Sequence, residues 1–99
     1  MTRPLALWLE ADRDLIRITR WYNRQQLGLG RYFWNQAQFA HDRIESNPEL
    51  YAPIWLNVRV GRIPKFPYLI YHRIRTDRVE VFGVLHAKRG RRAWRSRLG

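Results

Sequence analysis

The sequence has no cysteine, few acidic residues and no long apolar run. Without cysteine it can form no disulfide and offers no thiolate metal ligand. No stretch approaches the ~20 apolar residues that a membrane-spanning helix needs. The first residues are interrupted by Arg3, Glu10 and Asp12, so no apolar run there is long enough for a signal peptide. These absences predict a cytoplasmic protein with no membrane partner, and we expect no metal and no cofactor.

What the chain does have is aromatic residues and positive charge. Five Trp and five Tyr in 99 residues give enough apolar surface to offset the entropy of folding, so we expect an ordered chain. At this length the prediction is one compact domain over residues 1–99, in which residues 88–99 form a basic C-terminal segment.

Charge is unevenly distributed along the chain. Lys and Arg number 19 against 8 Asp and Glu, a net charge of +11. Residues 1–50 carry a net charge of only +1, whereas residues 51–99 carry +10. Such asymmetry indicates an anionic partner, either nucleic acid or an acidic protein segment.

The first half of the sequence predicts a short strand and two helices. Residues 4–9 alternate as a strand does, and Asp12 is the expected N-cap of a helix that runs to about Gln26. A second helix is expected from Gly30 to Ser46. Each helix has one apolar stripe: Ala11, Leu15, Ile18 and Tyr22 in the first, and Phe33, Ala37, Ala40 and Ile44 in the second. The glycines near residue 28 and Pro48 end these helices, so the pair forms a hairpin.

The second half predicts three strands, at residues 54–60, 66–74 and 78–86. In the last of these, Val79, Val81 and Leu85 are expected on one face and Phe82 and Val84 on the other, which is typical of a central strand covered on both sides. Residues 88–99 are expected to form either a final strand and turn or a frayed tail, ordered in part because Trp94 packs.

These elements predict the α+β class. An N-terminal strand is followed by a helical hairpin and three strands (order βααβββ), and the hairpin packs on one face of a small antiparallel sheet. Arg59 and Arg73 are expected to project from the other face.

Seven short pieces of the sequence, taken in order, resemble the RelE/ParE toxin family. They are Asp14-Leu15 with Ile18 and Trp21-Tyr22, Gly28-Leu29-Gly30 with Phe33, Asn47-Pro48, Val58-Arg59, Phe66-Pro67-Tyr68 with Ile70-Tyr71, Val84-Leu85-His86, and Arg89 with Trp94. The resemblance covers about residues 10–94 and is closest to the ParE-like and plasmid-stabilisation toxins. One departure is Arg91, which stands where similar proteins usually have proline.

The resemblance implies a type II toxin–antitoxin system. Its toxins are held inactive, in a hetero-oligomeric complex, by a small acidic antitoxin whose wrapping segment folds on binding. The cationic second half of this chain suits such a partner, because it would steer an anionic segment toward it.

The resemblance leaves three functions open. The first is a ParE-like toxin that inhibits DNA gyrase without chemistry of its own and so blocks replication and growth. The second is a RelE-like endonuclease that cuts mRNA at the ribosome, and the third is a non-toxic member that only binds an antitoxin. The closer resemblance to ParE and the lack of an obvious acid–base set favour the gyrase inhibitor over the endonuclease. Whether the chain is an enzyme stays open.

RNA cleavage would need a base, an acid and cations to stabilise the developing phosphorane charge. His86, Arg89 and Arg59 are the candidates for these roles, with Arg73 or Lys65 positioning phosphates, although His86 is as well explained as a structural histidine. The predicted surface for the target or the antitoxin comprises Arg59, Arg62, Lys65, Arg73, Arg89, Trp55 and Trp94, of which Trp94 is better explained as an anchor.

Three other aromatic or histidine positions are expected to be structural. His72 is predicted to be packed in the core or at an edge, and His41 to be exposed on the second helix and inert. Tyr68 and Tyr71 should lie on opposite faces of the sheet.

Overall fold

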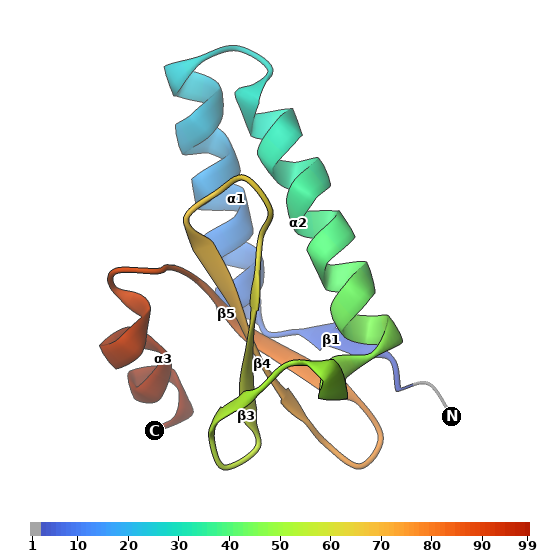
Figure 1. The fold of residues 1–99 in the computed structure, drawn as a ribbon. Helices are drawn as coiled ribbons and strands as arrows, with labels where there is room; N and C mark the ends of the chain where they lie inside the picture. Colours follow the sequence, from blue (N-terminus) through green and yellow to red (C-terminus); the bar gives the residue numbers. More distant parts are fainter. Residues whose placement is uncertain (1–2) are drawn as a thin grey trace.

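The computed structural model describes residues 3–99, apart from the side chains of residues 90 and 91, so the departure at Arg91 lies outside the described side chains. The elements are β1 (Leu5–Leu7), α1 (Leu9–Gln25), α2 (Leu29–Ser46), a short 3₁₀ helix η1 (Pro48–Leu50), β2 (Pro53–Trp55), β3 (Val58–Arg62), β4 (Tyr68–Ile74), β5 (Val79–His86) and α3 (Gly90–Leu98). The strands form one sheet in the order β1-β5-β4-β3-β2 (Figure 1). The predicted α+β class and helical hairpin are confirmed.

The sheet is mixed, and the prediction of a purely antiparallel sheet was wrong in this detail. β1 pairs with β5 in parallel, from Leu5 opposite Val79 to Leu7 opposite Val81, and the other strand pairs are antiparallel. Parallel neighbours need a long connection, and two helices and three strands separate β1 from β5. As predicted, β5 is central, and all its residues but the last are buried.

Three element boundaries differ from those predicted. Helix α1 begins at Leu9 and not after Asp12, because the Trp8 amide pairs with Val81 and the Trp8 carbonyl accepts the Asp12 amide, the first bond of the helix. The predicted strand 54–60 is two strands, β2 and β3, joined by a turn at Leu56–Asn57. The C-terminal segment is ordered as a helix, α3, which was not predicted. Within residues 3–99, no helix combines the length and apolarity needed to cross a membrane.

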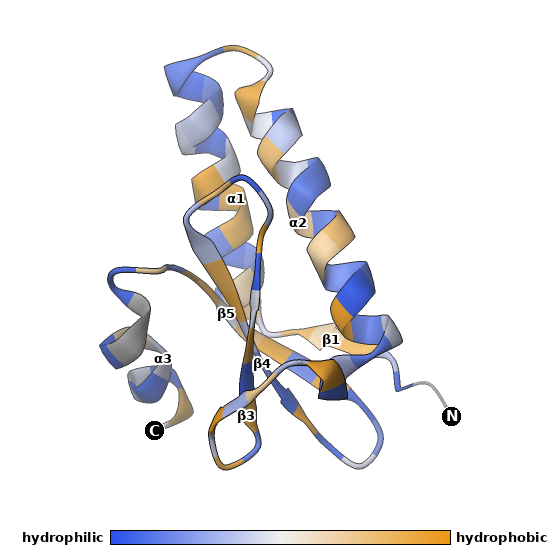
Figure 2. Cartoon of the chain, viewed as in Figure 1, coloured by the Kyte–Doolittle hydropathy of each residue, from blue (hydrophilic) through white to orange (hydrophobic). Residues whose placement is uncertain are grey.

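The two helices of the hairpin approach each other closely near their connecting turn. Gly28 there has a φ of +90°, a conformation that favours glycine. A Cβ on Gly30 would lie 2.5 Å from the carbonyl oxygen of Thr19, so only glycine permits this contact between α1 and α2. Figure 2 shows hydrophobic and hydrophilic bands alternating along both helices, as the predicted stripes require.

The stripes of α1 and α2 pack on one side of the sheet, which we call the hairpin face. The main core there contains the predicted helix residues Leu15, Phe33 and Ile44, together with β-strand residues such as Ile70 and Val81. The ring of Phe33 lies 5.1 Å from that of Phe66 and 5.5 Å from that of Tyr22, so an aromatic cluster forms the part of this core nearest the hairpin turn.

A β-bulge in β5 sets which residues face which side. Tyr71 pairs with Gly83 but His72 pairs with Val81, so Phe82 is an extra residue in the strand. As a result Val84 joins Val79 and Val81 in the core of the hairpin face, and Leu85 joins Phe82 on the other side. The predicted faces of Val84 and Leu85 were therefore wrong.

The other side of the sheet, the α3 face, carries a second and smaller core. Trp94 of α3 is 5% exposed and stacks on Tyr71 with ring centroids 6.2 Å apart. Val58, Phe82 and Leu85 complete this cluster. Tyr68 packs against the hairpin-face core and Tyr71 lies in this cluster, which confirms that the two tyrosines lie on opposite faces. The interpretation of Trp94 as an anchor is also confirmed, since its burial holds α3 on the sheet.

Candidate functional site

The residues predicted to form a functional site are divided among three parts of the molecule. Arg59 lies under η1, on the hairpin face. His86 and Arg89 line a groove between α1 and α3. Arg73, Trp55 and Trp94 line a hollow on the α3 face, while Arg62 and Lys65 are exposed on and just after β3.

Arg59 does not project from the side opposite the helices, and this prediction was wrong. Its Nη1 donates hydrogen bonds to the carbonyl oxygens of Tyr51 at 2.6 Å and Glu49 at 3.2 Å. The turn at residues 56–57 interrupts the strand alternation, so Trp55 and Arg59, which both belong to the predicted binding surface, lie on opposite faces. Arg59 is therefore engaged in holding the chain around η1 to the sheet.

Beside Arg59, two histidines are buried within the hairpin face. His72 is fully buried, as predicted, and His41 is only 4% exposed, so the prediction that His41 is exposed was wrong. The α2 helix turns His41 inward, where its Nδ1 donates to the carbonyl oxygen of Ala37 at 2.7 Å. Nε2 of His41 and Nδ1 of His72 have no hydrogen-bond partner within residues 3–99.

Burial determines how these histidines titrate. Desolvation lowers the pKa of His72 to about 4, although the carbonyl of Pro48 acts in the opposite direction. Burial also lowers the pKa of His41, partly offset by its hydrogen bond to Ala37. Both side chains are thus neutral structural groups at neutral pH.

His86 and Arg89 are the two members of the predicted catalytic set that lie in one groove. His86 ends β5, where its ring meets the edge of Tyr68 at 5.3 Å and its Nδ1 accepts the Lys88 amide at 3.1 Å. Arg89 is exposed just before α3. Arg17, Trp21 and other residues of α1 form the opposite wall.

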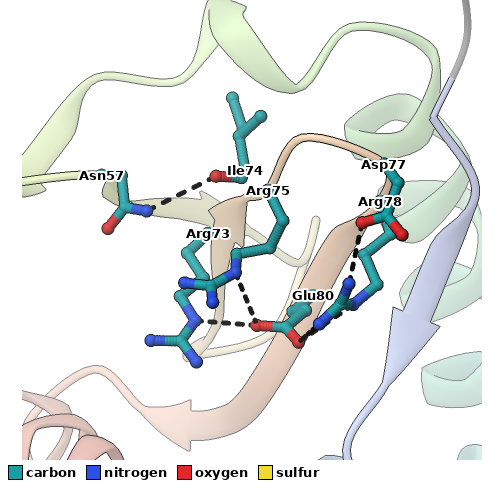
Figure 3. Close-up of polar contacts among 7 residues, drawn as sticks. All are labelled: Asn57, Arg73, Ile74, Arg75, Asp77, Arg78 and Glu80. Atoms are coloured by element: carbon teal, nitrogen blue, oxygen red, sulfur yellow. Dashed lines mark hydrogen bonds and ion pairs between the residues drawn. The ribbon is translucent and has the colours of Figure 1, made fainter.

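Arg73 projects on the α3 face, as predicted, but it is held by an ion-pair cluster around Glu80 (Figure 3). Its Nε donates to Glu80 at 2.8 Å, and Arg78 donates to the other carboxylate oxygen. Burial raises the pKa of Glu80, but the hydrogen bonds and charges of Arg73 and Arg78 outweigh it and hold that pKa below its ordinary value. The Arg73 guanidinium also lies 5.4 Å from the Trp8 ring, so two sets of contacts hold this side chain in place.

Trp55 is the exposed aromatic residue among those predicted to bind a target. It is 46% exposed and lies 6.0 Å from Trp94, which is buried. The Arg95 guanidinium sits between 5 and 6 Å from both rings, at 5.7 Å from Trp55 and 5.5 Å from Trp94. Trp55, Arg62, Lys65 and Arg89 are thus the predicted binding residues that remain at the surface.

Sequence reasoning missed the role of Asp14, which is 1% exposed. Its carboxylate accepts the Val84 amide at 2.9 Å and Nη2 of Arg97 at 2.9 Å. β1 ends opposite Val81, so the Val84 amide of β5 has no β1 residue beside it. Asp14 accepts the hydrogen bond of this amide instead. A usable signal was present, because Asp14 lies between Ala11 and Ile18 within the apolar stripe of α1.

Arg97 completes this contact from the opposite side of the sheet. It passes over Gly83, where a Cβ would lie only 3.2 Å from its Nη1, and it also donates to the Phe82 carbonyl. The hydrogen bond to Asp14 raises the pKa of Arg97, so the guanidinium stays charged. Within residues 3–99 there is no group of three or more His, Cys, Asp or Glu residues that would hold a metal ion.

Comparison with solved structures finds the same fold in chains from two toxin–antitoxin systems. The chromosomal ParDE system of P. aeruginosa includes a chain that matches with a TM-score of 0.77 and 12% identity, over 86% of this chain and 96% of that one. The E. coli DinJ-YafQ toxin–antitoxin complex includes one that matches with a TM-score of 0.62 and 8% identity, over 89% and 96%. At such identities the likeness shows the fold alone.

The sequence itself decides the family. The profile of a family described as the ParE toxin of the type II toxin–antitoxin system, parDE, matches residues 7–91. The chain therefore belongs to the ParE toxin family of type II toxin–antitoxin systems. No curated protein sequence matches it.

Proposed function

We propose that this chain is a toxin that inhibits DNA gyrase by binding it in the cytoplasm, without chemistry of its own. One observation carries the choice against an endonuclease: Arg59 and His86 are held apart. Across the sheet Arg59 pairs with His72, and His86 pairs with Tyr68, which lies four residues before His72 in β4. Four residues of strand span ~13 Å, and Arg59 is already bonded to two carbonyl groups.

The same proposal includes a neutralising partner. An acidic antitoxin segment that folds on binding would form a hetero-oligomeric complex with the chain. The predicted binding residues that remain exposed, Trp55, Arg62, Lys65 and Arg89, are the contacts we propose for the target or the antitoxin. Arg59, Arg73 and Trp94 would support this surface without touching the partner.

A supercoiling assay tests the proposal. The purified chain is added in increasing amounts to gyrase, ATP and relaxed plasmid, and the DNA forms are separated on a gel. We expect supercoiling to fall with dose, and the His86→Ala variant, if folded, to inhibit as the original chain does. Unchanged supercoiling at a large excess of the chain would overturn the proposal.

Pulse-labelling in bacteria tests the same proposal in cells. After controlled expression of the chain, DNA synthesis should fall before RNA or protein synthesis. If protein synthesis falls first, the gyrase proposal is wrong. Continued growth would instead favour a member that only binds an antitoxin.

The second candidate function, cleavage of mRNA at the ribosome, is favoured by the shared position of His86 and Arg89 in one groove. Its test is the double variant His86→Ala/Arg89→Ala, expressed in cells and checked for folding. An endonuclease would lose its toxicity in this variant, whereas toxicity that persists excludes these residues as its catalytic groups.

A further inference from the structure

The groove between α1 and α3 has features beyond those used above. We call it the arginine groove and define it by Arg17, Trp21 and Arg24 of α1, His86 of β5, Arg89, and Arg92 of α3. Ile18, Leu85 and Ala93 lie at its apolar base, and Arg97 closes it where that side chain reaches Asp14. The groove is thus formed by segments from both ends of the chain.

The lining of the arginine groove is cationic. None of the described residues that line it is acidic. Arg24, Arg89 and Arg92 make no ion pair within the described part of the chain, and Arg17 reaches Asp14 at 3.3 Å while its side chain stays 60% exposed. Several guanidinium groups therefore face solvent together, an arrangement that attracts a polyanion.

The positive charge continues along the outer side of α1. Arg13, Arg17, Arg20 and Arg24 follow the i, i+4, i+7, i+11 spacing of one helix stripe and, with Ile16, line a shallow hollow. At 1.5 Å per residue this stripe is ~16 Å long, which suits an extended anion better than a compact one. The acidic residues of the same helix, Glu10, Asp12 and Asp14, lie at its beginning. Residues 1–50 therefore have a low net charge although α1 carries a cationic stripe.

Aromatic rings lie among these arginines. Trp21 is 48% exposed and meets Tyr22 edge-on at 5.1 Å, so much of the indole surface stays open. Tyr68 and His86 add two rings to the same groove. A positive groove that contains exposed aromatic rings is the pattern by which proteins bind single strands, with phosphates on the cations and bases stacked on the rings.

We propose that the arginine groove binds single-stranded nucleic acid, with phosphates on Arg17, Arg24 and Arg92 and a base stacked on Trp21. Binding needs no gyrase and no bond-making step, so it goes beyond the gyrase proposal, whereas the second candidate function would itself require RNA to bind in this groove. A peptide of acidic residues alone would satisfy the arginines but has no ring to stack on the exposed indole of Trp21, and this observation favours a polynucleotide.

The test is fluorescence anisotropy of labelled twelve-nucleotide oligo-dT and oligo-U, and of a blunt DNA duplex, at a series of salt concentrations. We expect at least one single strand to bind more tightly than the duplex, with log Kd rising linearly with log salt. Arg24→Gln and Arg92→Gln should each reduce that slope by about 0.7. Trp21→Ala should weaken binding about tenfold, and Trp21→Phe should restore most of it.

Two matched variants serve as controls. Arg43→Gln removes a charge from α2, where Arg43 lies over Phe39, and Trp34→Ala removes an indole that is 37% exposed on α2. Both should bind as the original chain does, and circular dichroism should show all variants folded. Three outcomes would overturn the proposal: neither oligonucleotide binds, the Trp21 and Trp34 variants behave alike, or a glutamate peptide of equal charge binds as tightly as the oligonucleotides.

Discussion

Among the described residues, thirteen apolar ones are buried in the core of the hairpin face, whereas the cluster on the α3 face contains five. The two faces also differ in the charge of their polar side chains. Under the hairpin, His41 and His72 are buried and neutral, while the side chains that hold the α3 face include the charged pairs of Glu80 and of Arg97. The comparison indicates that apolar packing stabilises the first face and that ion pairs largely position the second.

The largest expected effect comes from removing Phe33, a fully buried ring of the hairpin-face core. Phe33→Ala should lower the free energy of unfolding by about 4 kcal/mol, because it leaves a cavity among Tyr22, Phe66 and Tyr68. Urea denaturation followed by circular dichroism measures this. Phe39→Ala, on the exposed side of the same helix, is the control and should change stability by less than about 0.5 kcal/mol. Equal losses for both variants would contradict the assignment of this core.

Breaking the ion pair between the faces should have the next largest effect. Asp14→Ala leaves Arg97 unpaired and the Val84 amide without its acceptor, so we expect a loss of about 3 kcal/mol in urea denaturation. Asp12→Ala removes an exposed carboxylate from the same helix and should have little effect. In a double-mutant cycle, Asp14→Ala and Arg97→Ala should be strongly non-additive. Additive losses would show that the contact does not stabilise α3.

The neutral histidines of the hairpin face predict a sensitivity to acid. The pKa of His72 is about 4 in the folded chain against 6.5 in the unfolded one, so the unfolded state binds more protons between these values. Stability should therefore fall by about 2 kcal/mol between pH 7 and pH 5. Chemical denaturation at each pH measures this. His72→Leu should remove most of the drop and His86→Leu should leave it; a drop of the same size in both variants would be evidence against burial of His72.

The smallest effect is expected on the α3 face, where Glu80 has several cationic neighbours. Arg73→Met keeps the packing on Trp8 but removes one hydrogen bond, and Arg78 still pairs with the carboxylate. We expect a loss of about 1 kcal/mol. Arg75→Met is the matched control, because Arg75 is more exposed and its Nε lies 3.8 Å from Glu80. If the control loses more stability than Arg73→Met, the cluster is organised around Arg75 instead.

Much of this fold could be predicted from the sequence, because the helix stripes and strand alternation record which residues are buried. Leu15 and Phe33 were placed correctly by spacing alone. The turn at Leu56–Asn57 was missed because it interrupts the strand alternation without a glycine or proline. The bulge at Phe82 was missed although Gly83 follows it, and an isolated glycine in a strand is a signal for a bulge. The missed turn misplaced Arg59 and hence the candidate site.

The C-terminal helix was missed for a different reason. In residues 88–99 positive charge dominates the composition, and Trp94 alone indicated packing. The buried side of α3 consists of Trp94 with Ala93 and Leu98, a spacing that is helical but too short to distinguish from a turn. Arg97 of α3 pairs with Asp14, which lies 83 positions away in the sequence, and no local pattern links the two residues.

That separation has a consequence for how the chain is made. Ribosomes add ~5–20 residues per second, so Asp14 is synthesised several seconds before Arg97. Throughout that interval the Asp14 carboxylate has no Arg97 guanidinium to pair with, and the arginine groove lacks the residues of α3. We therefore expect the chain to acquire its complete surface only after α3 has been synthesised.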